Sequence, residues 1–230
     1  LRNFRTMIYI NSILALSKRE FQINFRNISD ILSIFIFFFL GIIVFVFAIG
    51  FQNKIFEEIG IGIIWTLILL SNTLSIKKFF QNDFDDNSIV IFHLSGLTYE
   101  IISLIKIIII WMLIQGPFFF IIPLAMLLLN INVDNLAMIF LSFLIGSVII
   151  SCITSISASM NLLNKNNFAI GSLIIMIFSI PVIIFSTGLV NSNKDIIVAQ
   201  INILLGIMFL FLAISPWICG ICIKISIQNK

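Results

Sequence analysis

Residues 59–88 pass directly from an apolar run into a polar one: IGIGIIWTLILLSNTLSI (59–76) is followed by KKFFQNDFDDNS (77–88). The first part is long and apolar enough to cross a bilayer, which takes roughly 17–25 mainly apolar residues. The second part holds three of the ten acidic residues of the chain. This junction predicts a membrane helix that ends at an aqueous compartment, where residues 77–88 meet a soluble partner.

The composition of the whole chain agrees with a membrane protein. Of its 230 residues, 60% are hydrophobic and 10% are charged, whereas soluble domains have about 25% charged residues. The net charge of +3 is too small and too dispersed along the chain to indicate a nucleic-acid partner. We therefore expect an all-α integral membrane protein.

Six apolar runs are long enough to cross the membrane. They cover residues 31–49, 59–76, 101–129, 136–160, 168–190 and 196–223. The third run contains Gly116-Pro117, which predicts a kink because proline removes a helical hydrogen bond. In the fourth run, Ser147, Ser151 and Ser155 recur every four residues, which favours close helix packing over a polar translocation lining. The chain then divides into an N-terminal segment, 1–30, and a six-span transmembrane domain, 31–230.

Residues 1–30 have the pattern of an amphipathic helix that lies at a membrane surface. The apolar side consists of Ile10, Leu14, Phe21, Phe25 and Ile28, and the polar side of Arg19, Gln22 and Arg26. Arg19, Phe21 and Arg26 are the interfacial residues that we single out. A solvated helix that packs on a partner remains an open alternative.

The basic residues predict the orientation of the spans. With a cytoplasmic N-terminus, ten lysines and arginines lie inside and two outside, as the positive-inside rule requires. Residues 77–99 then form a cytoplasmic coupling loop, and both termini are cytoplasmic. Lys106 lies one to two turns inside the third run, and we expect its amine to snorkel toward lipid headgroups.

The sequence contains little that would support catalysis. It has no G-x-x-x-x-G-K-[ST] phosphate-binding loop, so any ATP hydrolysis belongs to a separate subunit. His93 is the only histidine, which excludes a histidine-rich metal site. No nucleophile–base pair or ligand cluster occurs at membrane depth, which disfavours an integral membrane enzyme. We expect no cofactor bound by this chain alone.

The polar stretch itself has the pattern of a docking helix. Phe80 and Phe84 are four residues apart and share one helical face, and Asp83, Asp85 and Asp86 form a charged rim around it. Aromatic anchors with a charged rim are how a short helix fills a groove on another protein.

The same region resembles the cytoplasmic loop of ABC-2 type permeases. In those proteins an acidic segment is followed by Gly-Ser/Thr-Leu-Glu and then by a Leu-Ser-Pro-Leu-like turn. Here the segments are DFDDNSI (83–89) and LSGL (94–97). Asn87 stands in place of the glycine, Val90 in place of the glutamate and Gly96 in place of the proline.

Over nearly its whole length the chain is similar to the haem exporter B family of cytochrome c maturation permeases. The similar segments are KREF (18–21), GIIW (62–65), Lys106 with Trp111, IPVIIF (180–185), LAISP (212–216) and KISI (224–227). The family often has histidine where Ile110 stands, and Arg-Gly-Gly where residues 165–167 stand.

The resemblance implies a permease subunit of an ATP-driven complex in the bacterial inner membrane. Its implied partners are an ABC ATPase subunit, a haem-handling membrane subunit, a small membrane subunit and a periplasmic haem chaperone. Phe80, Asp83, Phe84, Asp85 and Asp86 would then dock on the ATPase, which binds the ATP.

Two roles for the permease remain open at this point: haem crosses it as cargo, or ATP hydrolysis releases the haem-loaded chaperone. The sequence favours release, because haem iron usually takes an axial side chain such as histidine and His93 is cytoplasmic. A permease of the same fold that moves lipid or polysaccharide is the alternative.

Overall fold

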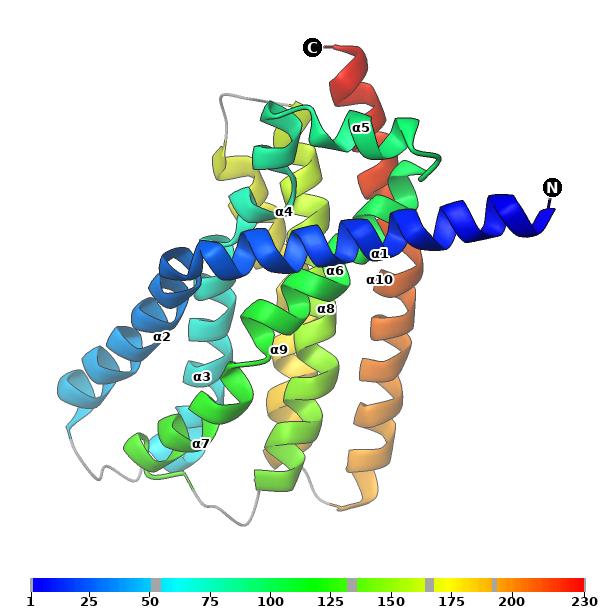
Figure 1. The fold of residues 1–230 in the computed structure, drawn as a ribbon. Helices are drawn as coiled ribbons and strands as arrows, with labels where there is room; N and C mark the ends of the chain where they lie inside the picture. Colours follow the sequence, from blue (N-terminus) through cyan, green and yellow to red (C-terminus); the bar gives the residue numbers. More distant parts are fainter. Residues whose placement is uncertain (1, 51–54, 132–135, 164–167, 192–193, 230) are drawn as a thin grey trace.

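The computed structural model describes residues 2–50, 55–131, 136–163, 168–191 and 194–229, and every regular element in these ranges is a helix (Figure 1). The all-α prediction is confirmed for this part of the chain. The helices are α1 (Arg2–Arg26), α2 (Ile28–Ile49), α3 (Ile55–Thr73), α4 (Ile76–Asp85), α5 (Ser88–Leu94), α6 (Tyr99–Gln115), α7 (Phe118–Leu128), α8 (Leu136–Leu163), α9 (Phe168–Asn191) and α10 (Lys194–Gln228).

Six stretches in the described ranges are long and apolar enough to cross a membrane, and they coincide with the six predicted runs. They are Ile31–Ile49, Ile55–Thr73, Tyr99–Leu128, Leu136–Leu163, Ile170–Val190 and Ile196–Gln228. The six-span prediction is confirmed, with shifted ends.

The second span ends at Thr73, before the predicted end at residue 76. Around this end the side-chain hydroxyls bond to backbone carbonyls: Thr73 Oγ1 donates to Leu70 O at 2.6 Å, and Ser75 Oγ donates to Asn72 O at 2.7 Å. Such local bonds compete with the helical ladder and favour a helix end. The chain therefore turns here and starts α4 at Ile76.

The third span is two helices. α6 ends at Gln115 and α7 starts at Phe118, with Gly116 and Pro117 between them. The predicted interruption of the third run is confirmed, and Figure 1 shows a short non-helical link between α6 and α7.

α8 is the central helix of the bundle and packs along α9 and α10. Ser147, Ser151 and Ser155 are all buried. Ser155 lies against α10, where the Sγ of Cys219 is 3.6 Å from its hydroxyl. The packing prediction for this serine row is therefore confirmed, because small side chains allow the helices to approach closely.

α1 lies across the bundle instead of along it (Figure 1). Leu16 is buried against Leu97, Ile102 and Ile105, in a small core between α1 and α6. The five residues of the predicted apolar side, Ile10, Leu14, Phe21, Phe25 and Ile28, are all exposed. This side is therefore free to contact lipid, as the interfacial prediction requires.

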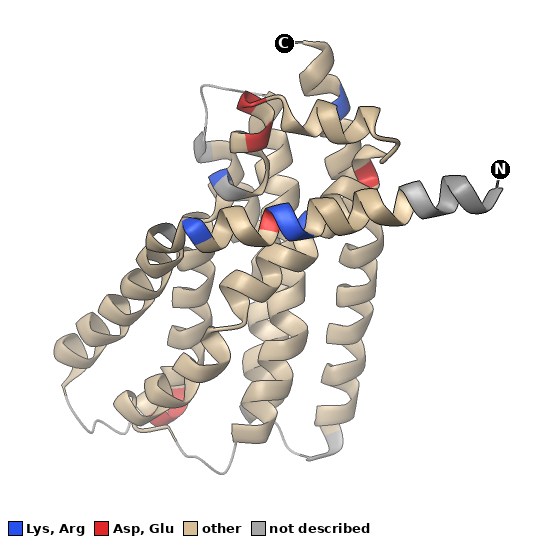
Figure 2. Cartoon of the chain, in the orientation of Figure 1, with Lys and Arg blue, Asp and Glu red and all other residues tan. Residues whose placement is uncertain are grey.

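Residues 77–99 are mostly helical and lie beyond α1. In Figure 1, α4, α5 and the start of α6 are on the same side of α1 as the end of α10. Figure 2 shows most of the charged residues on α1 and beyond it, and the long apolar helices on the other side. With its 35 residues, α10 is about 52 Å long, well over the roughly 30 Å of a hydrocarbon core. α10 is therefore longer than a straight crossing of the hydrocarbon core requires.

Candidate functional site: a charged cluster under the coupling loop

Four ionised side chains from three helices meet where α1 crosses the bundle. Lys106 of α6 donates from Nζ to Glu20 Oε2 at 2.8 Å, and it also forms an ion pair with Asp83 of α4. Arg19 donates to Glu20 Oε1 at 2.9 Å and to Asp83 Oδ1 at 2.7 Å. We call Arg19, Glu20, Asp83 and Lys106 the charged cluster. It joins α1, α4 and α6.

The helical periodicity of α1 and α6 explains why these charges face each other. Glu20 follows Leu16 by four residues, so both lie on the face of α1 that packs on α6. Lys106 follows Ile102 by four residues and lies on the same face of α6. The apolar contacts of Leu16 and Ile102 thus bring the carboxylate and the amine together.

The cluster is buried but electrically balanced. The side chains of Lys106 and Glu20 are 2% and 3% exposed, and that of Asp83 is 10% exposed. Two cations therefore face two carboxylates away from water. A buried charge is costly unless it is paired and hydrogen-bonded, and each charge here has at least two polar partners.

The two carboxyl groups respond differently to this environment. Burial raises the pKa of Glu20 above its ordinary value, and repulsion by Asp83 adds to the rise despite the nearby cations. Burial alone would also raise the pKa of Asp83. Attraction to Lys106 and hydrogen bonds from Arg19 and Lys106 together outweigh that effect, so the pKa of Asp83 lies below its ordinary value.

Arg19 also ties α5 to the cluster. Its Nη2 donates to Ser88 Oγ at 2.9 Å, and its guanidinium carbon lies 5.3 Å from the centre of the Phe92 ring. This distance is typical of a cation–π contact. Arg19 therefore holds both helices of the coupling loop against α1.

The predicted docking helix exists, but its apolar face points into the bundle. α4 packs against α8, and Phe80 and Phe84 are 0% and 3% exposed. Asp83 is buried too, because it pairs with Arg19 and Lys106. The prediction that these three side chains enter a groove on another protein is therefore wrong for this arrangement of the helices.

Asp85 and Asp86 are exposed at the end of α4, as a docking surface requires. Asp85 accepts hydrogen bonds from Gln81 Nε2 at 3.1 and 3.0 Å. Their role in docking stays a prediction.

Lys106 does not reach toward headgroups. Its side chain is 2% exposed and its amine pairs with Glu20 and Asp83, so the snorkelling prediction is wrong. Glu20 was not among the predicted site residues. The signal was available: Glu20 lies four residues after Leu16 on the helix, and an unpaired lysine inside an apolar run needs an acidic partner.

The other two interfacial residues, Phe21 and Arg26, are exposed on α1, whereas Arg19 is half-buried in the cluster. The polar side of α1 is therefore divided between the bundle and the solvent.

Backbone conformation accounts for two departures from the permease loop pattern. Asn87 has φ 57°, in the left-handed region that glycine and asparagine adopt most readily. Asparagine can therefore hold this turn at the position where the resembled loop has glycine. Gly96 has φ 97°, which proline cannot adopt because its ring fixes φ near −65°. The turn before α6 must therefore differ from the Leu-Ser-Pro-Leu form.

His93 is placed for a structural contact. Its Nδ1 is 2.9 Å from the carbonyl oxygen of Leu97, and its ring stacks on Tyr99 with centroids 4.1 Å apart. Within the described ranges, no group of three or more His, Cys, Asp or Glu residues is placed to hold a metal ion.

Comparison with known proteins places the sequence in a family. The family described as "CcmB protein" matches residues 11–226. The chain is 31% identical to Heme exporter protein B of Haemophilus influenzae, over 94% of this chain and 99% of that protein. It is 24% identical to Heme exporter protein B of Pseudomonas aeruginosa, over 94% and 98%.

A further relative is a putative cytochrome c biogenesis ccmB-like mitochondrial protein of Marchantia polymorpha, which is 28% identical over 86% of this chain and 69% of that protein. The family match begins within α1 and ends in the last turn of α10, so the four sequence positions of the charged cluster lie inside it. The chain belongs to the CcmB protein family.

Proposed function

We propose that this chain is the membrane permease subunit of a haem-export complex that serves c-type cytochrome biogenesis. The observation that carries the proposal is the family match over residues 11–226, on a fold with six candidate spans. The two relatives that match this chain over nearly its full length are each named Heme exporter protein B. A permease is not itself an enzyme, and ATP hydrolysis is assigned to a separate ABC ATPase subunit.

Loss of the gene tests this function. The cells are expected to lose covalently bound haem in their c-type cytochromes, measured by haem staining of denatured membrane proteins, and to regain it when the chain is supplied again. Normal covalent haem together with altered envelope lipid or polysaccharide would favour the alternative permease.

The complex contains, in this proposal, an ABC ATPase, a haem-handling membrane subunit, a small membrane subunit and a periplasmic haem chaperone. The chain spans the bacterial inner membrane with both termini in the cytoplasm. In support, Figure 2 shows Lys and Arg residues on α1 and on the side of α4 and α5, which is therefore assigned to the cytoplasm. Mild-detergent purification of the tagged chain, followed by identification of the co-purified proteins, tests the subunit composition.

The ATPase docks, in this proposal, on the exposed end of α4 at Asp85 and Asp86. The charged cluster then transmits the movement of the ATPase to α1 and α6. Asp83 of α4 makes this connection, because it is bonded to α1 through Arg19 and to α6 through Lys106. This assigns Phe80, Asp83 and Phe84 to holding α4 in place, and the exposed acids to contact.

The double variant Asp85→Asn/Asp86→Asn is expected to co-purify with much less ATPase while the chain remains in the membrane. The matched control is Glu57→Gln/Glu58→Gln, a pair of exposed neighbouring acids near the opposite end of the bundle. Full ATPase recovery with the first variant would contradict docking at this surface.

Release of a haem-loaded chaperone, driven by ATP hydrolysis, is the role that we assign to the complex in preference to passage of haem through this chain. The support is chemical. Haem iron takes axial ligands such as histidine, and the ring of His93 is stacked on Tyr99, on the proposed cytoplasmic side. Haem that co-purifies with the isolated chain in a fixed ratio would contradict this role.

A further inference from the structure

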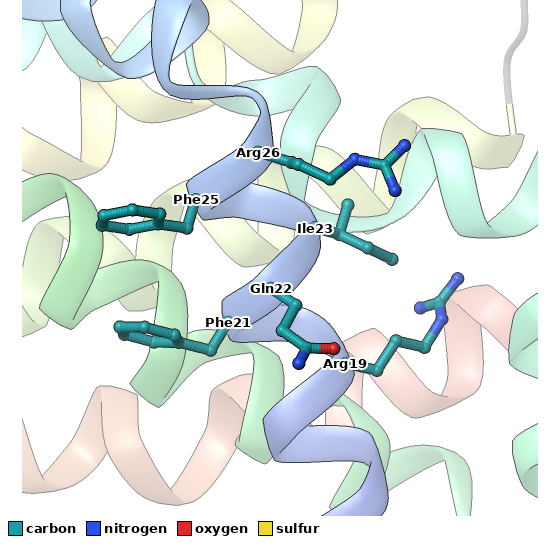
Figure 3. Close-up of a pocket in the computed structure, with 6 residues that line it drawn as sticks. All are labelled: Arg19, Phe21, Gln22, Ile23, Phe25 and Arg26. Atoms are coloured by element: carbon teal, nitrogen blue, oxygen red, sulfur yellow. The ribbon is translucent and has the colours of Figure 1, made fainter.

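α1 carries a trough on its surface that the permease function does not use. It has a volume of about 600 Å³. It is lined by Arg19, Phe21, Gln22, Ile23, Phe25 and Arg26. Figure 3 shows Phe21 and Phe25 extending to one side of the helix, Arg19, Ile23 and Arg26 to the other, and Gln22 between them. The trough therefore has an aromatic wall and a basic wall.

The aromatic wall is fully formed and open. Phe21 and Phe25 stack with their ring centroids 6.0 Å apart and their planes 14° from parallel. They are 50% and 59% exposed. Since they belong to the exposed apolar side of α1, they provide a flat surface on which hydrocarbon chains can lie.

The basic wall ends in an exposed cation. The guanidinium of Arg19 is already bonded to Glu20, Asp83 and Ser88, so it contributes mainly its stem to the wall. Arg26 is exposed in the last turn of α1. An arginine fork matches the oxygen geometry of a phosphate group. Gln22, exposed between the walls, offers an amide donor to the same group.

We propose that this trough binds one anionic phospholipid, with its phosphate group at Arg26 and Gln22 and its acyl chains across Phe21 and Phe25. A lipid matches the two walls because it carries charge and hydrocarbon in one molecule. A free phosphate would use only the basic wall, and an apolar protein segment only the aromatic wall. The proposal does not depend on what the permease moves.

The site also bears on the charged cluster. Arg19 lines the trough with its stem and bonds to Asp83 and Ser88 with its guanidinium. A bound lipid therefore packs against the residue that holds α4 and α5 to α1.

The test uses the full chain, purified in a neutral detergent and equilibrated with phosphatidylglycerol or phosphatidylcholine. Bound lipid is counted by native mass spectrometry. We expect one tightly retained phosphatidylglycerol, held at least five-fold more tightly than phosphatidylcholine. Arg26→Gln is expected to weaken phosphatidylglycerol binding about five-fold, the effect of roughly 1 kcal/mol per basic residue near an anionic surface. Phe21→Ala/Phe25→Ala is expected to weaken both lipids.

The matched control is Lys18→Gln, which removes an exposed cation of the same helix that does not line the trough. It is expected to leave phosphatidylglycerol binding unchanged. Equal weakening by Lys18→Gln and Arg26→Gln would overturn the proposal in favour of diffuse surface charge. Displacement of the lipid by millimolar inorganic phosphate would show a simple anion site. Failure of the chain to bind lipid until a co-purified subunit is removed would show that a protein segment occupies the trough. Unchanged thermal transitions of the variants show that folding is intact.

Discussion

Lys106 shows how one residue sets the geometry of the bundle where α1, α4 and α6 meet. It is an amine buried in an apolar helix, and it is stable there because Glu20 and Asp83 each supply a carboxylate. A buried ion pair adds little net stability compared with apolar packing, but loss of one partner leaves an uncompensated charge. The cluster therefore specifies which faces of α1, α4 and α6 meet more than it strengthens the fold.

Lys106→Met is expected to destabilise the chain by about 3–5 kcal/mol, because Glu20 and Asp83 then share only Arg19. The double variant Lys106→Met/Glu20→Gln removes one charge of each sign and should recover part of this loss. Thermal unfolding in detergent measures both. A double variant less stable than the sum of the two single changes would contradict the pairing.

Asp83 gives the cluster a defined response to acid. The pKa of Asp83 is lowered in the folded chain. Its contribution to the free energy of unfolding is therefore complete at pH values above its ordinary pKa of 3.8, and it is lost as the pH falls through the lower pKa of the folded chain. The difference in apparent Tm between the wild type and Asp83→Asn should be constant from pH 7 to about pH 5 and should shrink below pH 3.8. A difference that shrinks already between pH 7 and pH 5 would show that Asp83 is not held ionised by the two cations.

At the scale of the elements, α8 is positioned by small residues. Gly146 faces the ring of Trp65, and a Cβ atom added there would lie 3.1 Å from Cζ2 of that ring. Trp65 and Phe143 also pack together, with centroids 6.1 Å apart. The contact of α3 with α8 thus depends on the absence of a side chain at residue 146.

Gly146→Ala is expected to destabilise the bundle by about 1–3 kcal/mol, because the added methyl overpacks a fully buried contact. Gly206→Ala in α10 is the matched control, since nothing lies within 4 Å of its added Cβ. Alanine favours the helix by up to roughly 1 kcal/mol there, so the control should be neutral or stabilising. The apparent Tm values of the two variants are compared. An equal decrease of Tm in both variants would rule out the Trp65 contact as the cause.

The sequence predicted the elements better than their contacts. Length and apolar character were sufficient for the six spans, and Gly116-Pro117 for the break between α6 and α7, because these properties are local. The charged cluster joins residues 64 and 86 positions apart, and no periodicity relates such distant residues. For the same reason the apolar face of α4 was assigned to a partner protein, whereas α8 of the same chain covers it.

For the whole molecule, the central proposal is that α4 and α5 face the cytoplasm. In a His93→Cys variant, the new thiol should react with a membrane-impermeant maleimide only after the cells are opened. The native thiols Cys152, Cys219 and Cys222 are buried, so they should contribute little labelling. Reaction in intact cells would reverse the orientation and, with it, the position of the ATPase.

The charged cluster, in this account, passes movement from the docked ATPase to α1 and α6. Arg19→Gln tests this link directly, because it removes the direct bonds from α1 to Asp83 and Ser88 while Lys106 still pairs with Glu20 and Asp83. The measurement is covalently bound haem in c-type cytochromes, normalised to the amounts of the chain and of co-purified ATPase. We expect normal ATPase recovery with covalent haem reduced roughly five-fold or more, as for a lost coupling of at least ~1 kcal/mol. Wild-type covalent haem in the Arg19→Gln cells would contradict the account.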